Sequence, residues 1–160
     1  MKILRKLRTL GSLDSEFRWL VLEALLVPVL VSSGYRIIGV KRTQAWLRRW
    51  ALAGKNRSPR PDVPSQIHSV RRAQRIVKRS LGIEGRCLTR AFTLWALLLR
   101  QGLGTDLRVG FRKFGGKLEG HAWVEYRGVP LNEAPEVNLR YTVFKEPAAF
   151  DIRQKPDYWN

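Results

Sequence analysis

The N-terminal third of the chain places apolar side chains with the period of an α-helix. Phe17, Leu20 and Leu25 share one face, which predicts a helix that begins near Ser15. Because proline removes a backbone donor, we expect this helix to break near Pro28 and to end over residues 32–34, Ser-Ser-Gly. A second amphipathic helix is expected over residues 40–53, where tryptophan and leucine interleave with lysine and arginine.

A proline-rich segment separates these helices from the rest of the chain. Residues 54–64 contain three prolines and a glycine and are expected to form a linker. Ser65 is the expected cap of the next helix, whose apolar stripe continues to Gly82. Its polar side is either a solvated face or a docking surface for an acidic partner. The arginines that would form such a surface are Arg71, Arg72, Arg75 and Arg79.

The C-terminal half changes from helical to strand periodicity. Residues 87–100 are apolar nearly all round, which predicts a central, buried helix. Strict alternation then predicts strands at 107–111 and 118–126, with Gly115-Gly116 as the turn between them. Shorter strands are expected at 129–131 and 141–144. The pattern therefore predicts an α+β fold in which an antiparallel sheet packs on the last helix.

The most apolar stretch runs from Trp19 to Val40 and has two readings. Its longest uncharged run, Ala24 to Tyr35, is twelve residues, whereas a bilayer-spanning helix needs about 20. It is therefore expected to be a core-packed helix or a peripheral membrane contact rather than a transmembrane span. The basic N-terminus lacks the apolar region and cleavage site of a secretory signal, so a cytoplasmic location is expected, with contact at the membrane surface as the alternative.

Charge and cysteine content narrow the chemistry. Thirty Lys and Arg against thirteen Asp and Glu give a net charge of +17. Residues 1–86 carry nineteen basic and five acidic side chains, so nearly all of this excess lies in the first half. A single cysteine excludes an intramolecular disulfide and a multi-cysteine metal site. We expect no metal and no other cofactor.

The single cysteine and one of the two histidines fall at compatible places. Cys87 opens the buried helix, where unpaired backbone N–H groups and the helix dipole favour a thiolate. His121 lies on the second long strand, which folds back toward that helix, so the two can form a nucleophile–base pair. The next strand ends at Asn132-Glu133, and either residue can orient the imidazole. Glu125 is the competing carboxylate, which is otherwise a solvated or arginine-paired surface charge.

Together these segments resemble a known family. CLTRAFTLWALLLRQG, then GHAWVEYRGVPLNEAPEV and RYTVF, are similar to the stand-alone leader peptidase of lasso-peptide biosynthesis, the C-terminal half of the microcin-processing B protein. The similarity covers roughly residues 65–145. It implies a transglutaminase-like, papain-like core over residues 65–160, preceded by a basic and apolar helical region at 1–53 and the linker at 54–64.

The resemblance also implies an activity and partners. Cys87 matches the nucleophile, His121 the base, and Glu133 stands where the family has an aspartate. The implied reaction removes the leader from a ribosomally made precursor peptide. The implied partners are that precursor, a small leader-recognition protein and an ATP-dependent macrolactam synthetase.

Two other classes of function compete with this reading. Arginines interleaved with Trp46 and Trp50 are compatible with a nucleic-acid-binding surface. The sequence contains no helix-turn-helix or zinc ligand set, however, and no nucleic acid is expected. The second competitor is an inactive transglutaminase-like scaffold, or an acyl transferase that uses the same Cys–His pair.

Overall fold

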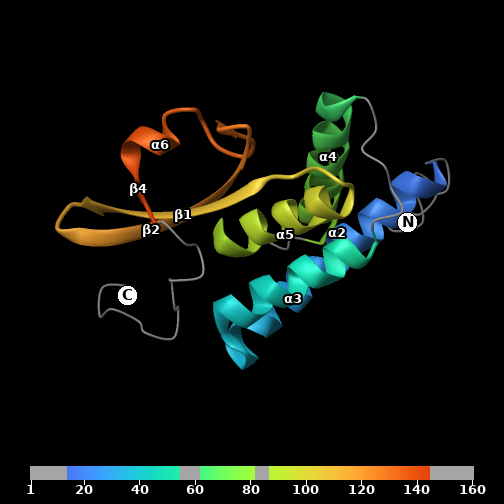
Figure 1. Ribbon diagram of the computed structural model, residues 1–160, viewed down its shortest axis with the longest axis horizontal. Coiled ribbons are helices and arrows are strands. Elements are labelled where there is room, and N and C mark those ends of the chain that lie inside the picture. Colours follow the sequence, from blue (N-terminus) through green and yellow to red (C-terminus); the bar gives the residue numbers. More distant parts are fainter. Residues whose placement is uncertain (1–13, 55–61, 82–86, 145–160) are drawn as a thin grey trace.

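The computed structural model describes residues 14–54, 62–81 and 87–144 of the 160-residue chain. The larger helices come first and the sheet follows them (Figure 1). The helices are α2 (Ser15–Ile37), α3 (Gly39–Ala53), α4 (Val63–Leu81), α5 (Cys87–Arg100) and the short α6 (Val137–Arg140). The strands are β1 (Asp106–Phe114), β2 (Lys117–Tyr126), β3 (Val129–Pro130) and β4 (Thr142–Val143).

Helix α5 is the centre of the molecule. Its side chains are apolar on almost every face, and those from Ala91 to Leu98 are all buried. Figure 1 shows α5 between the sheet on one side and α2 and α3 on the other, and it contacts all of them as well as α4. One hydrophobic core therefore joins the N-terminal helices to the sheet.

The sheet is antiparallel with the strand order β3-β2-β1-β4. In the β1–β2 register Leu107 lies opposite Val124, and Val109 lies opposite Ala122. These four side chains belong to the core that contains α5. Because side chains alternate along a strand, the odd-numbered residues of β2, among them His121, lie on the opposite face. The α+β fold expected from the sequence is confirmed.

The expected break at Pro28 is wrong. Helix α2 continues through it to Ile37. Proline removes one helical hydrogen bond, but Val27 and Val31 on either side are buried in the core, and this packing holds the helix together. Gly34, expected at the helix exit, lies inside α2, where the absence of a side chain lets Thr43 of α3 approach closely.

Helix α4 begins earlier than Ser65. Its first residue is Val63, and the Asp62 Oδ1 atom accepts a hydrogen bond from the Ser65 backbone N–H at 3.1 Å. Asp62 is thus the capping residue, and Val63 and Pro64 form the first turn rather than the end of a linker. The rest of the expected linker after Gly54, residues 55–61, and the expected helix end at Gly82 lie outside the described residues.

Strand positions agree with the alternation, with small shifts at the ends. The first strand extends beyond the expected 107–111 to Phe114, and the third strand ends at Pro130 rather than at residue 131. The last strand is reduced to residues 142–143. Helix α6, a single turn before that strand, has too few residues to leave a periodic signal in the sequence.

Candidate active site

Cys87 is the first residue of α5, as its position in the sequence predicted. The side chain is half-buried. Its sulfur is hydrogen-bonded to the His121 side chain and to the backbone N–H groups of Leu88 and Ala122. The thiol therefore lies where the N-terminus of a helix meets the edge of β2, with donors on both sides. Such surroundings stabilise a thiolate.

Among the described residues, no strand pairs with the outer edge of β2 at Ala122, because β3 is only two residues long. β3 pairs only with the last two residues of β2. One position further along the edge, the Val124 N–H donates to the Asn132 Oδ1 atom at 2.8 Å. The next donor on the same edge belongs to Ala122, two residues away, and it bonds to the sulfur of Cys87. Asn132 therefore completes the sheet edge next to the thiol rather than contacting His121.

Glu133 is the neighbour of Asn132 that contacts the imidazole. Its Oε1 atom lies 3.1 Å from the His121 Nε2 atom. The same oxygen lies 3.9 Å from the Arg90 Nη2 atom, on the first turns of α5. Since Nε2 faces the carboxylate, Nδ1 is the ring nitrogen that remains for the thiol of Cys87. The structure thus brings all three residues predicted from the sequence into one chain of contacts.

Aromatic side chains fix the plane of the imidazole. The Tyr141 ring stacks on His121 with centroids 5.2 Å apart, and the Trp123 ring stacks at 6.2 Å. Trp123 is held in turn by a 2.9 Å hydrogen bond from Nε1 to the Glu125 Oε1 atom. Glu125 is only 4% exposed and also pairs with the Arg108 Nε atom at 2.9 Å. Glu125 is therefore a buried, arginine-paired carboxylate that holds Trp123 in place rather than a surface charge.

Gly110 makes room for this arrangement. It lies opposite His121 in the β1–β2 register. A Cβ atom on Gly110 would lie 2.9 Å from the Thr142 carbonyl oxygen and 3.1 Å from the Tyr141 Cβ atom. Only glycine therefore lets β4 pass close enough for Tyr141 to stack on the imidazole. A glycine inside an alternating strand indicates such a close approach, but the sequence analysis drew no inference from Gly110.

The pKa values of Cys87 and His121 shift in opposite directions, and each shift stabilises the charged form of its side chain. Burial raises the pKa of the Cys87 thiol, but the hydrogen bond and charge of His121, together with the two backbone donors, outweigh burial and lower it. The hydrogen bond to Cys87 raises the pKa of His121, against the opposing effect of burial and with added support from the Glu133 charge. Both shifts favour a thiolate–imidazolium ion pair near neutral pH.

A buried hydroxyl near the thiol was missed by the sequence analysis. The Tyr35 ring, near the end of α2, packs edge-on against Phe92 of α5 with centroids 5.2 Å apart. Its hydroxyl is buried and has no hydrogen-bond partner among the described residues. Burial, and then the nearby negative charge of Cys87, raise the pKa of this hydroxyl. Tyr35 enters the site only because α2 continues past Pro28.

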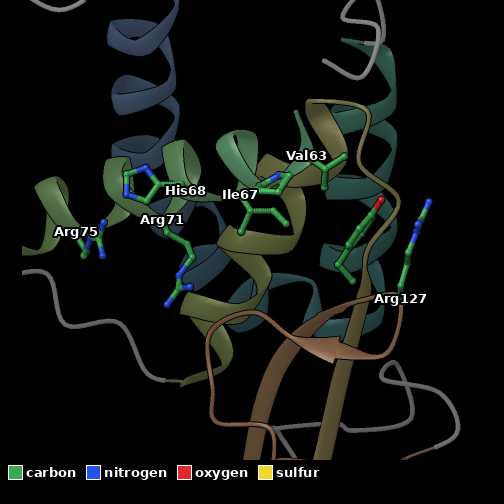
Figure 2. Close-up of a pocket in the computed structure, with 8 residues that line it drawn as sticks. Val63, Ile67, His68, Arg71, Arg75 and Arg127 are labelled. Carbon is green, nitrogen blue, oxygen red and sulfur yellow. The ribbon is translucent and has the colours of Figure 1, made fainter. Parts of the chain in front are cut away.

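The four arginines predicted as a docking surface are all exposed but do not gather at one place. Arg71 and Arg75 line a pocket of about 550 Å³ between α4 and the end of β2. Arg72 instead lies over the Phe17 ring, with Cζ 4.9 Å from the centroid, and Arg79 does not line the pocket. Figure 2 shows Arg127, from the β2–β3 turn, on the side of the pocket away from Arg71.

The interior of this pocket is apolar. Its other lining residues are Val63, Pro64, Ile67, His68 and Tyr126. A hydrophobic floor with cationic groups at its edges suits a peptide segment that carries both an acidic and an apolar side chain. Arg127 was missed because its place in the pocket depends on where the β2–β3 turn lies relative to α4, which the periodicity of neither element reveals.

A thiol at a helix N-terminus, paired with an imidazole on the neighbouring sheet and with a carboxylate from the segment that follows the sheet's edge strand, is the arrangement of cysteine nucleophile sites. A family model described as the transglutaminase-like superfamily matches residues 35–146. The chain therefore belongs to the transglutaminase-like superfamily. No curated protein and no solved structure matches the chain. The matched segment begins at Tyr35 and includes all the residues of the site, whereas most of α2 precedes it.

Proposed function

We propose that this protein is a cysteine peptidase that removes the leader from a ribosomally made lasso-peptide precursor. The observation that carries the proposal is the contact chain Cys87–His121–Glu133, which is poised for acyl chemistry. The Cys-Leu-x-Arg, His-Ala-Trp-Val-Glu and Leu-Asn segments, which resemble the lasso leader peptidase, support the choice of substrate. Membership of the transglutaminase-like superfamily is consistent with it.

The reaction follows from the positions of the three side chains. The Cys87 thiolate attacks the carbonyl at the leader–core junction, and the backbone N–H of Cys87 itself, at the start of α5, stabilises the oxyanion. The C–N bond breaks as His121 gives its proton to the departing amine of the core peptide. The leader remains as a thioester on Cys87. His121 then takes a proton from water, which hydrolyses the thioester and frees the leader acid.

The proposed partners follow from the same resemblance. A small leader-recognition protein would present the precursor, and an ATP-dependent macrolactam synthetase would close the ring on the released core. The peptidase residues themselves need no nucleotide, since thioester formation and hydrolysis use only the thiol, the imidazole and water.

The test is cleavage of a linear lasso precursor in the presence of its leader-recognition protein, read by mass spectrometry. The expected result is one cut at the leader–core junction, with a free carboxylate on the leader. A leader that carries an added amine instead of a carboxylate would identify an acyl transferase. An intact precursor, under conditions in which the recognition protein binds it, would overturn the proposal.

We propose further that the pocket between α4 and β2 holds an acidic residue of the leader. Tyr126, in its wall, and His121 are five positions apart on β2, roughly 16 Å at 3.3 Å per residue. An extended peptide of about five residues spans that distance. The pocket therefore suits a leader side chain several residues before the scissile bond, and Arg71, Arg75 and Arg127 supply the complementary charge.

Reversing two charges in this pocket is expected to weaken substrate binding. In the double variant Arg71→Glu and Arg75→Glu, we expect KM for the precursor to rise about ten-fold with little change in kcat, since neither residue belongs to the Cys87–His121–Glu133 contacts. The matched control is Arg48→Glu with Arg49→Glu, an equal charge change at exposed positions of α3 that do not line the pocket. Equal KM values for both double variants would contradict leader docking here.

Removing the charge of Glu133 is expected to slow turnover and shift its pH range. Glu133 raises the pKa of His121, so Glu133→Gln should move the alkaline limb of the kcat/KM profile to lower pH. We expect kcat/KM to fall about ten- to a hundred-fold, with partial rescue by Glu133→Asp. The matched control is Glu136→Gln, at an exposed position three residues further on. A reduced rate with an unmoved alkaline limb would mean that Glu133 acts only structurally.

A further inference from the structure

Helix α2 has two apolar faces, and the helices and strands of the described part of the chain pack against only one of them. The inner face packs against α4, α5 and α3. Its buried residues are Leu20, Val21, Ala24, Val27, Val31 and Tyr35. The inner side also carries Glu23, whose Oε1 atom accepts a 2.8 Å hydrogen bond from the Arg100 Nε atom of α5. These contacts account for the core packing expected of this helix, but they leave its opposite face exposed.

The outer face is an apolar stripe that Ser33 alone interrupts between Trp19 and Ile37. Its large side chains are Trp19, Leu22, Leu26, Val29, Leu30 and Ile37, all at least 45% exposed. At 100° per residue these positions fall within about a third of the helix circumference, directly opposite the buried face. Ser33 is the one polar residue among them. Monomeric soluble proteins rarely expose so large a continuous apolar surface, so this stripe is expected to bind something.

Basic side chains stand beside the stripe. Arg18 and Arg36 are exposed, and because they are about five helical turns apart they lie on the same line along α2, next to Val29. Helix α3, which packs on α2, carries one exposed lysine, Lys41, and three exposed arginines. Trp19, at one end of the stripe and 62% exposed, is the side chain most typical of a membrane–water interface.

We propose that the outer face of α2 binds the surface of an anionic membrane, with the helix lying in the plane of the interface. The apolar stripe enters the boundary between headgroups and acyl chains, while Arg18 and Arg36 meet anionic headgroups. The net charge of +17 adds a long-range attraction to the same surface. The proposal is independent of the chemistry at Cys87.

The buried inner face of α2 indicates whether this helix lies on a membrane or crosses it. Among the described residues, α2 is long and apolar enough to span a bilayer. A spanning helix would have to withdraw its inner face from α4 and α5 and carry Glu23 away from Arg100 into hydrocarbon. In the plane of the interface, the same helix keeps every core contact and buries only its exposed stripe.

The experiment is flotation of the full chain with vesicles of phosphatidylglycerol and phosphatidylcholine in equal parts, and with phosphatidylcholine alone. We expect binding to the anionic vesicles that weakens at high salt. The double variant Leu26→Gln and Leu30→Gln is expected to bind at least about ten-fold less tightly. Both positions are exposed, so the fold should be retained, and circular dichroism checks this. The matched control is Val129→Gln with Leu139→Gln, exposed apolar residues outside α2.

A second readout locates the contact on the helix. Lipids with brominated acyl chains should quench the fluorescence of the wild type more than that of Trp19→Phe, since Trp19 enters the acyl boundary. Equal vesicle binding by both double variants, or no binding to anionic vesicles, would overturn the proposal. It would equally be overturned if lipid-free wild type sedimented as a dimer that the α2 variant dissociates, because a second copy would then cover the stripe.

Discussion

Replacement of Cys87 by serine is expected to abolish precursor cleavage, with kcat falling at least about a thousand-fold. The serine hydroxyl has nearly the size of the thiol, so the hydrogen bonds at the start of α5 can be retained. It does not ionise near neutral pH, however, and His121 is held as the partner of a thiolate. The ion pair on which the proposed attack depends therefore cannot form.

The measurement is mass spectrometry of precursor incubated with wild type, Cys87→Ser and Cys87→Ala at equal concentration. Because the chain has a single cysteine, iodoacetamide labelling of the intact protein also reports on this residue alone. Wild type treated with iodoacetamide should lose activity in proportion to the labelled fraction. Cleavage at the wild-type rate by either variant, or by fully labelled protein, would exclude Cys87 as the nucleophile.

Whether a residue of this site could be predicted from the sequence depends on which part of the structure positions it. The position of Cys87 depends on the start of one helix, and the apolar pattern of that helix is local. His121 lies on a strand whose alternation was evident. Their pairing needed only the expectation that the sheet folds back on the helix. Local pattern and an antiparallel connection were therefore enough for these two residues.

The choice between Asn132 and Glu133 could not be made from the sequence. It depends on the length of β3, which pairs with only two residues of β2 before the chain leaves the sheet. That early departure lets Asn132 satisfy Val124 with its side chain and turns Glu133 toward His121. Two adjacent polar residues exchange roles if such a turn shifts by one position, and no periodicity registers that shift.

The missed residues share a different cause. Tyr35 reaches the site only because tertiary packing carries α2 through a proline that local propensity treats as a stop. Tyr141 reaches His121 only because Gly110 lets β4 approach β1. Arg127 joins the pocket because the β2–β3 turn lies across it from α4, a helix distant in the sequence. In each case the information lies in contacts between elements rather than within one.

Substitution of His121 by glutamine is expected to move the titration of the thiol, and this tests the ion pair without any assumed substrate. In the wild type, the bond and charge of His121 are the chief opponents of burial and lower the pKa of Cys87. Once they are removed, burial remains and raises the pKa again. The thiolate should then form only at higher pH than it does in the wild type.

The measurement is the rate of Cys87 alkylation by iodoacetamide as a function of pH. Below the thiol pKa the reactive fraction falls ten-fold per pH unit, so each unit of increase in this pKa slows alkylation at neutral pH about ten-fold. We expect His121→Gln to be at least about ten-fold slower there, with its rate recovering at alkaline pH. His68→Gln is the matched control, since His68 is exposed on α4 and should leave the profile unchanged.

The same ion pair fixes the pH range of turnover. At low pH the thiolate is protonated, and the acid limb lies below the ordinary range for a thiol because the Cys87 pKa is lowered. At high pH the imidazolium loses the proton that the departing amine requires, and this limb lies above the ordinary range for histidine because the His121 pKa is raised. A bell-shaped kcat/KM profile is therefore expected. Matching alkylation profiles for wild type and His121→Gln would show instead that the helix N-terminus alone activates the thiol.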